Sequence, residues 1–451
     1  MSQQDQKREI FGSRLGFLFA AAGSAIGLGS LWRFPWLVGA NGGSAFLIIY
    51  LVIAVFIGIS LFMCELVLGR ATQSSNVGAF RKISPSWASL GGLGPLAAFL
   101  ILCFYSVVGG WIIYYFFRTI AGLNITDPAL TAELFNNFTA DPVLPLVLHG
   151  IFMGLTMLIC YKGVVNGIEK ASTIMMPILF AIIVPLAVRA LTLPGAAEGL
   201  RFYLVPDFSR VTAKTFMDAM GQVFFSLSLG MGATLTYGSY LGKHENIPVL
   251  SLIVTLVDVL IGFMAGIIIF PIVFSFGFQP GAGTGLTFIT MPAIFSEMPA
   301  GKLFGSIFFF LFFLSALTSS ISLLEAAIAY LIEEHGWDRK RATLVSGTVS
   351  FVVGCLASLA MGPLSGFTIK GLNFFGQLDW VSATILQPLC GILTAILVSW
   401  IWGSRNAIQE ITSDGRVKFA LASIWTNVIL RCVAPISVGL IFLAGLGVIR
   451  L

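Results

Sequence analysis

The sequence predicts an all-α membrane protein, a single transmembrane domain over residues 1–451 with about eleven spanning helices. The chain is 57% hydrophobic and only 10% charged, whereas a soluble domain carries about 25% charged residues because its surface is wetted. Apolar runs of the roughly 20 residues needed to cross a bilayer recur along its whole length. Two of these runs are interrupted by glycines at matching places in two blocks of five spans.

Apolar runs between charged or Gly/Pro-rich breaks place the spans. In order they are 14–40, 43–70, 89–121, 143–161, 167–192, 213–241, 247–278, 303–334, 340–361, 372–402 and 424–447. The first five form repeat one (14–192), the next five form repeat two (213–402), and the last is an extra helix (424–447). The segment 281–295 is too polar and too broken by Gly and Pro to span, so we expect a surface loop with a short helix there.

Lys and Arg residues are more frequent in the loops on the side of the N-terminus than in the loops on the other side. Positive charge marks cytoplasmic loops, so the N-terminus is expected inside, and an odd number of spans then places the C-terminus outside. The first 13 residues are polar and lack a cleavable signal pattern, so the first span is expected to stay in the mature protein.

The two interruptions are Gly23 to Ser30 and Ser226 to Gly232. Each glycine weakens a helix by about 1 kcal/mol relative to alanine. Paired interruptions in two halves point to a transporter binding site, because unwound backbone in a membrane is tolerated where it coordinates an ion or a ligand. The alternative is close helix packing, for which glycine is also common.

Several polar side chains are expected at membrane depth, where charges are rare and usually functional. Three carboxylates stand inside apolar runs: Glu65, Asp258 and Glu325. Four hydroxyls cluster within one span: Ser315, Thr318, Ser319 and Ser320. Hydroxyls are suitable ligands for a small cation, although Ser and Thr also commonly bond back to their own helix. The six cysteines and three histidines form no metal or catalytic motif, so no enzymatic activity is expected.

Three segments resemble the signatures of the neurotransmitter:sodium symporter family. They are Gly23 to Pro35 followed by Asn41 to Phe46, then Gln222 to Gly232, and Leu317 to Ser320. The resemblance runs in order from Arg8 to Asp379, and it implies a LeuT-type fold with a 5+5 inverted repeat and interrupted helices 1 and 6. The family usually has twelve spans, so the resemblance leads us to expect that the last one is absent here.

The resemblance implies two Na⁺ sites, a substrate site and two gates. Sodium site A would use Ala25, Ser30, Ser226 and Asp258, and sodium site B would use Gly23, Ile26, Ser315, Thr318 and Ser319. The substrate site would use Ala25, Gly27, Gly29, Ile101, Tyr105, Val108, Phe225, Ser226, Ser228, Met231, Ser319 and Leu323. The outer gate would be Arg33 with Asp379, beneath which Tyr105 and Phe225 form a lid, and the inner gate would be Arg8, Ser239, Tyr240 and Glu333.

Two substitutions within this pattern indicate ion and substrate selectivity. Asp258 stands where many members have asparagine, and its carboxylate can balance the sodium charge in place of chloride, so chloride-independent uptake is expected. In chloride-dependent members the anion is held by residues matching Tyr50, Gln222 and Ser226. Gly27 replaces the aspartate of monoamine carriers and leaves room for an α-amino acid carboxylate. Met231 replaces a frequent phenylalanine, and methionine fits varied hydrophobic side chains.

Gly167 and Pro177 enclose nine residues at the start of the fifth span. Proline removes one helical bond and glycine tolerates open backbone, so we expect this turn to unwind and admit water to sodium site B. A simple membrane-helix kink is the alternative interpretation.

The resulting hypothesis is a sodium-coupled symporter of the bacterial inner membrane that imports hydrophobic and aromatic L-amino acids by alternating access. Its expected partners are sodium, the amino acid and the lipid bilayer, without nucleic acid. The rival functions are a non-transporting amino-acid sensor on the same fold and a sodium channel. The sequence leaves the preferred amino acid, the stoichiometry, the oligomeric state, the captured conformation and the effect of lacking a twelfth helix open.

Overall fold

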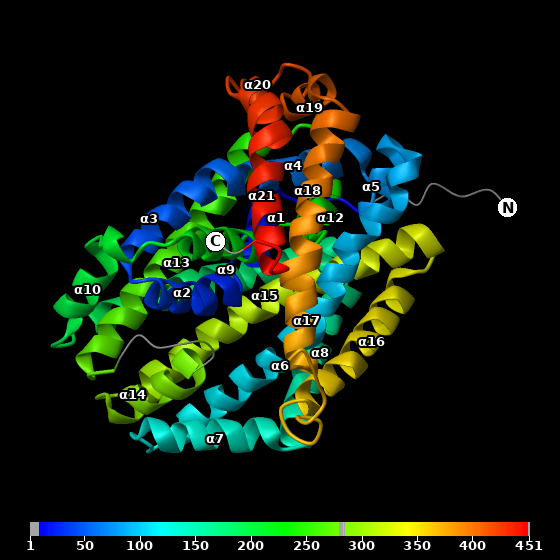
Figure 1. The fold of residues 1–451 in the computed structure, drawn as a ribbon. Helices are drawn as coiled ribbons and strands as arrows, with labels where there is room; N and C mark the ends of the chain where they lie inside the picture. Colours follow the sequence, from blue (N-terminus) through cyan, green and yellow to red (C-terminus); the bar gives the residue numbers. More distant parts are fainter. Residues whose placement is uncertain (1–8, 279–282, 284, 450–451) are drawn as a thin grey trace.

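The computed structural model describes residues 9–278, 283 and 285–449, and this part of the chain is a bundle of helices with one short hairpin (Figure 1). Nine of the described helices are long and apolar enough to cross a membrane. A tenth span is the bent pair Arg14–Ala25 and Gly29–Ala40, which meet at 47°. The sixth expected span is divided into two helices shorter than a membrane crossing, Ala213–Ser226 and Ala233–Ser239. Counting both divided spans, the described chain agrees with about eleven crossings.

The described residues of the first half of the chain form ten α-helices, joined or extended by short π-helical and 3₁₀ segments (η). The α-helices are α1 (Arg14–Ala25), α2 (Phe34–Ala40), α3 (Ser44–Ile53), α4 (Ile59–Thr72), α5 (Asn76–Ile83), α6 (Leu93–Ala121), α7 (Pro128–Ala140), α8 (Leu144–Tyr161), α9 (Lys170–Leu191) and α10 (Ala196–Leu204). The η segments are η1 (Gly29–Arg33), η2 (Ala54–Gly58), η3 (Pro85–Gly92), η4 (Val164–Glu169) and η5 (Phe208–Arg210).

The second half holds the remaining helices and the hairpin. The α-helices are α11 (Ala213–Ser226), α12 (Ala233–Ser239), α13 (Ile247–Ser275), α14 (Met291–Glu297), α15 (Gly301–His335), α16 (Arg339–Leu359), α17 (Phe374–Asp379), α18 (Gln387–Ile396), α19 (Ser404–Ile411), α20 (Ala422–Ile424) and α21 (Ala434–Gly445). The η segments are η6 (Leu286–Thr290), η7 (Trp380–Leu386), η8 (Leu397–Ile401) and η9 (Trp425–Val433). Strands β1 (Thr368–Ile369) and β2 (Leu372–Asn373) pair antiparallel.

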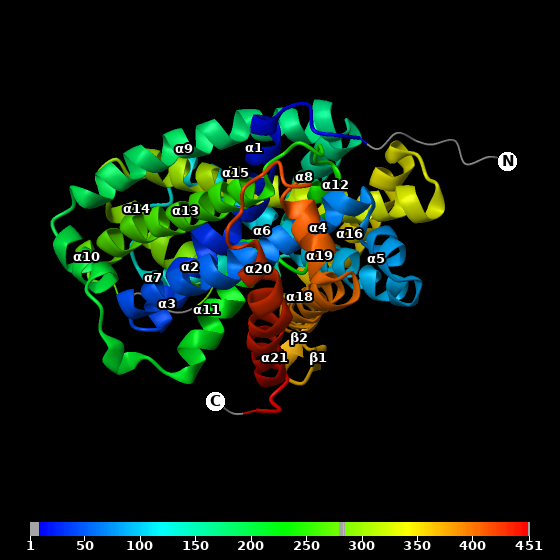
Figure 2. The same cartoon turned by 90° about the horizontal axis from the view of Figure 1, so that it is seen from above.

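The two longest inner helices, α6 and α15, pack together at the centre of the bundle, and most of their residues are buried. By contrast, α9 and α13 expose apolar side chains on one face, as lipid-facing helices must. Figure 2 shows α9 lying along one side of the bundle and α21 projecting from another. The core therefore forms around α6 and α15, with the divided spans α1–α2 and α11–α12 beside them.

The segments between spans differ from the expectation in one place. The region 281–295 was expected to be a surface loop with a short helix, and the described part does contain η6 and the short helix α14. Its side chains are not at the surface, however: Leu286, Phe288 and Met291 are all at most 1% exposed. Phe288 contacts the rings of Trp111, Tyr115 and Phe135, so this segment packs into the bundle because its aromatic and aliphatic residues have a partner there.

Candidate functional site

The first break lies between α1 and η1, at residues 26–28. The chain still turns there, since the Ile26 amide donates to Ala22 and the Gly27 amide donates to Ala25. The Leu28 amide has left the helix and donates to the Tyr105 hydroxyl on α6 at 3.2 Å. The break thus frees carbonyls of the last turn of α1 for contacts outside the helix.

The second break covers residues 227–232, between α11 and α12. Three of its residues adopt positive φ angles, namely Ser228, Gly230 and Gly232. A Cβ atom on Gly230 would collide with the backbone of Gln387 in α18, so a side chain cannot fit there. The Ser228 hydroxyl donates to the Ser24 carbonyl at 2.9 Å, which connects the two breaks directly.

Two polar side chains satisfy the exposed backbone of the second break. The buried Glu65 of α4 accepts a hydrogen bond from the Gly230 amide at 2.7 Å. The amide of Asn76, at the start of α5, donates to the Gly232 carbonyl at 3.0 Å. Unwound backbone within a membrane must find such partners, because no water is present to satisfy it.

Residues of the two breaks and of α6 and α15 line a small cavity. Ten of the twelve residues expected at the substrate site line it: Ala25, Gly27, Gly29, Ile101, Tyr105, Phe225, Ser228, Met231, Ser319 and Leu323. The other two, Val108 and Ser226, are buried but do not line the cavity. Two residues that were not expected, Ser24 and Leu28, line the cavity as well.

Gly27 is one of the lining residues of this cavity, and two hydroxyls converge on it. A Cβ atom at Gly27 would lie 2.5 Å from the Ser319 hydroxyl and 3.0 Å from the Tyr105 hydroxyl. Any larger residue would therefore displace both polar groups. The space next to the two hydroxyls and the broken backbone exists because position 27 has no side chain.

The residues expected at sodium site B come together where the end of α1 meets α15. The Ser315 hydroxyl is 3.0 Å from the Ile26 carbonyl, and the Ser319 hydroxyl is 3.2 Å from the Gly23 carbonyl. Thr318 lies on the same face of α15, and a Cβ atom on Gly23 would come within 3.0 Å of it. The Thr318 hydroxyl bonds back to its own helix, to the Ser315 and Leu314 carbonyls. The five residues thus place neutral oxygen atoms close together, the donor type that a hard cation prefers.

Three of the four residues expected at sodium site A meet at one carboxylate, that of Asp258. Asp258 of α13 is fully buried, and it accepts hydrogen bonds from Ser30 at one oxygen and from Ser226 at the other, the latter at 2.5 Å. Tyr50 of α3 is 3.5 Å from the second oxygen. The fourth residue, Ala25, ends α1, and its carbonyl accepts from Gly27. A buried carboxylate ringed by hydroxyls supplies the negative charge that a buried cation needs.

The two residues expected at the outer gate lie close without forming a direct ion pair. Arg33 and Asp379 interact electrostatically, but no ion pair within 4.0 Å joins them in the described structure. The guanidinium of Arg33 instead stacks on the ring of Phe225, 4.9 Å from its centroid. Because Phe225 also lines the cavity, this stack covers the cavity on the side of η1 and α17.

The expected inner gate is described in part, because Arg8 lies outside the described residues. Ser239 is the last residue of α12 and Tyr240 follows it, and both are buried. Glu333, near the end of α15, accepts a hydrogen bond from the Ser75 amide. The structure therefore places Ser239 and Tyr240 at the end of the inner half of the divided span.

Helical turns run through the segment of the fifth span that was expected to unwind. Gly167 lies in η4, and its amide donates to the Gly163 carbonyl at 3.1 Å. A Cβ atom on Gly167 would collide with the Ile159 carbonyl of α8, so close packing is a sufficient reason for this glycine in the present conformation. Pro177 lies inside α9.

The sequence reasoning missed a second polar group at the inner end, although Glu325 had been noted as a buried charge. Glu325 is fully buried on α15, accepts from Tyr240 at 2.7 Å, and pairs with Arg339 of α16 through two bonds of 2.9 Å. Arg339 also bonds Glu9, whose carboxylate accepts from the Val164 amide.

The roles of Glu65 and Asn76 were missed too. Charge at membrane depth was the available signal for both glutamates, whereas Asn76 gave no sequence signal.

Comparison with known proteins assigns the family. The model of the sodium:neurotransmitter symporter family matches residues 8–127 and 145–450. A sodium-dependent transporter of Bacillus subtilis, YhdH, is 38% identical over 99% of both chains, and a sodium-dependent transporter of Haemophilus influenzae is 36% identical over 99% of this chain and 100% of its own.

The fold is also similar to a solved structure. The crystal structure of MhsT in complex with L-phenylalanine is 40% identical and superposes with a TM-score of 0.89, covering 97% of this chain and 100% of that chain. More distantly, the human sodium- and chloride-dependent GABA transporter 2 is 28% identical over 90% of this chain and 75% of its own. The expected LeuT-type membrane fold is thereby confirmed, and the chain is a member of the sodium:neurotransmitter symporter family.

Proposed function

We propose that this sodium symporter imports hydrophobic and aromatic L-amino acids, without a need for chloride, across the bacterial inner membrane, with its N-terminus in the cytoplasm. The observation that carries the proposal is the cavity between the two helix breaks. Its walls are mostly apolar, and the hydroxyls of Tyr105 and Ser319 converge next to Gly27. An amino acid with an apolar side chain matches this lining. Its charged backbone can lie against the hydroxyls, and its side chain can lie against the apolar walls.

The amino-acid backbone of the ligand would lie at the broken ends of α1 and α11. Gly27 leaves space there for a carboxylate, and the Tyr105 hydroxyl is within reach of the break. The apolar side chain would contact Ile101, Met231 and Leu323. Methionine adapts its shape, which supports acceptance of several side chains, including Leu, Ile, Val, Met, Phe, Tyr and Trp. The similarity to MhsT, solved with L-phenylalanine, favours the same ligand class.

Two sodium ions would bind beside this cavity. One would lie among the oxygens of Gly23, Ile26, Ser315, Thr318 and Ser319, and the other beside Ala25, Ser30, Ser226 and Asp258. Because both clusters include residues of the broken first span, sodium at either place would stabilise the same arrangement of the break that holds the ligand. This shared backbone is the physical basis for coupling sodium to the amino acid.

Chloride independence is argued from Asp258. Tyr50 and Ser226, which match anion ligands of chloride-dependent members, both contact this carboxylate. A fixed negative charge at that place balances a nearby sodium ion, and a chloride ion next to it would be repelled.

The test is uptake into proteoliposomes. We expect an inward sodium gradient to drive accumulation of labelled leucine, phenylalanine and tryptophan, with less than a twofold change when chloride is replaced by gluconate. Glycine and charged amino acids should compete poorly. Binding without accumulation would instead indicate the rival function, an amino-acid sensor, and a sodium current without amino acid would indicate a channel.

A further inference from the structure

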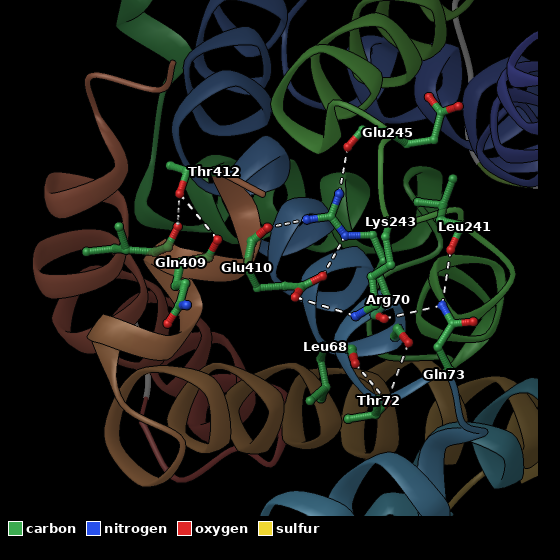
Figure 3. A network of polar contacts seen from close by, with 12 residues as sticks. Leu68, Arg70, Thr72, Gln73, Leu241, Lys243, Glu245, Gln409, Glu410 and Thr412 are labelled. Carbon is green, nitrogen blue, oxygen red and sulfur yellow. Dashed lines mark hydrogen bonds and ion pairs between the residues drawn. The ribbon is translucent and has the colours of Figure 1, made fainter. Parts of the chain in front are cut away.

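Arg70, at the cytoplasmic end of α4 in the proposed orientation, is a buried charge that none of the assignments above uses. Its side chain is 0% exposed. The guanidinium donates to the Glu410 carboxylate at 2.6 Å, to the Glu410 carbonyl, and to the Glu245 carbonyl at 2.6 Å (Figure 3). A buried arginine is stable only when such partners satisfy it.

These bonds join three segments that are far apart in the sequence. Arg70 belongs to α4, Glu245 belongs to the loop 240–246 between α12 and α13, and Glu410 belongs to α19. Gln73, just after α4, donates to the Leu241 carbonyl at 3.0 Å, so the same loop is held at a second point (Figure 3). The loop begins where α12 ends, and α12 is the inner half of the divided sixth span.

Two weaker ion pairs extend this cluster. Lys243, in the loop, is 3.6 Å from the Glu410 carboxylate. Arg14, the first residue of α1, is 3.8 Å from the Glu245 carboxylate. The cluster therefore reaches the inner ends of both divided spans, α1 and α12, and connects them to α19.

All of the bonds from the Arg70 guanidinium leave its own helix. An arginine that only covered its own helix end would bond to the carbonyls of α4. The planar guanidinium fixes direction as well as distance, because it binds its acceptors as a rigid fork. Arg70 therefore determines where the loop and α19 lie relative to α4.

We propose that Arg70 and Glu410 are positioning residues of the transport cycle, which hold the loop 240–246 against α19 and so keep the inner side of the cavity closed. The inference rests on the proposed transport function. For the cavity to open inward, α1 and α12 must move away from this cluster, so its bonds favour the closed state. Sodium at site B would favour the same state, because that site joins the end of α1 to α15.

The test uses the full chain in lipid vesicles. Glu410→Gln keeps the size of the side chain and the backbone acceptor but removes the charge facing Arg70, and Arg70→Lys keeps the charge but removes the fork. Asp414→Asn is the matched control, because Asp414 follows α19, bonds only Gln409 among the described contacts, and has a positive φ that asparagine accepts. The measurements are labelled L-phenylalanine binding at low and saturating sodium, and hydrogen–deuterium exchange.

For Glu410→Gln and Arg70→Lys we expect the phenylalanine Kd at low sodium to rise at least threefold, because fewer molecules are in the binding-competent state. Saturating sodium should return it to within twofold of the unsubstituted protein. Amide exchange should quicken in 233–246 but not in α8, and Asp414→Asn should change neither quantity.

Two results would overturn the inference. One is unchanged binding and exchange in both variants. The other is faster exchange across the chain, α8 included, with a Kd that sodium does not restore, since that pattern indicates a purely structural arginine. If the unsubstituted protein binds no phenylalanine, the proposed substrate is wrong, and the inference about Arg70 is then tested by hydrogen–deuterium exchange with sodium as the only added ligand. We expect sodium to slow amide exchange in 233–246 less in Glu410→Gln than in the unsubstituted protein.

Discussion

Among single residues, Gly27 has the clearest physical role. The two hydroxyls beside it, on Tyr105 and Ser319, come from different helices and converge on the space that a side chain would fill. Position 27 is therefore occupied by glycine for reasons of space, since its backbone needs no positive φ angle. The space available to the ligand at Gly27 therefore depends on how α1 packs against α6 and α15.

We predict that Gly27→Ala weakens substrate binding strongly. Forcing a methyl group into a packed site costs about 1–3 kcal/mol, which corresponds to a rise in Kd of roughly tenfold or more. The matched control is Gly221→Ala on α11, where a Cβ atom would meet nothing within 4 Å. Equilibrium binding of labelled phenylalanine measures both variants, and equal affinities would contradict the steric argument.

Among the helices, the divided spans and the fifth span illustrate two uses of glycine. In the sixth span, Gly230 and Gly232 have positive φ angles, which other residues rarely adopt. In the fifth span, Gly167 is helical and is required by its close approach to α8. The proposed unwinding of the fifth span therefore needs the contact between η4 and α8 to separate.

The fifth span offers an internal comparison, because α9 contains two prolines, Pro177 and Pro185. We predict that Pro177→Ala slows sodium release to the inside and lowers the uptake rate about threefold or more, since alanine strengthens the turn that is proposed to open. Pro185→Ala, two turns further along, should leave the rate within twofold. Uptake rates and substrate Kd measured together separate release from binding, and identical rates for both variants would favour a simple kink.

Across the bundle, polar contacts occur both at the expected outer gate and near the expected inner gate. At one end Arg33 stacks on Phe225, with Asp379 nearby. At the other end Tyr240, Glu325 and Arg339 are bonded together. In Figure 1, α7 and α14 lie near one end of the molecule and α19 and α20 lie near the opposite end. Transport by alternating access requires that these two sets of contacts open in turn.

We predict that Arg33→Gln and Asp379→Asn each lower the uptake rate at least tenfold, because each removes one charge of the proposed outer gate. The control is Asp207→Asn, which breaks an exposed pair with Arg210 at 3.4 Å; such surface pairs contribute about 0–1 kcal/mol. Initial uptake rates, corrected for the amount of protein in the vesicles, measure the effect. Gate variants that transport as well as the control would show that the stack of Arg33 on Phe225 closes the cavity by itself.

The sequence by itself determined the membrane class, the order of the spans and the two breaks, because these follow from local hydrophobicity and from glycine clusters. Its motifs also predicted the family, which the comparisons confirm. It could not place segments whose position depends on a distant partner. The segment 281–295 was expected at the surface, but most of its residues from Leu286 to Phe295 are buried, because Trp111, Tyr115 and Phe135 provide a pocket that no local pattern reveals.

Only the tertiary structure decided which polar groups meet. Asp258 and Ser30 are in contact although they are 228 positions apart, and Arg70 meets Glu410 across 340 positions. The sequence could show that a carboxylate lies in an apolar span, where desolvation of its charge is costly. It therefore predicted that the carboxylate has a partner, because this cost depends on the residue and on its surroundings along the helix. The identity of the partner depends on how the helices pack, and packing is a property of the assembled bundle.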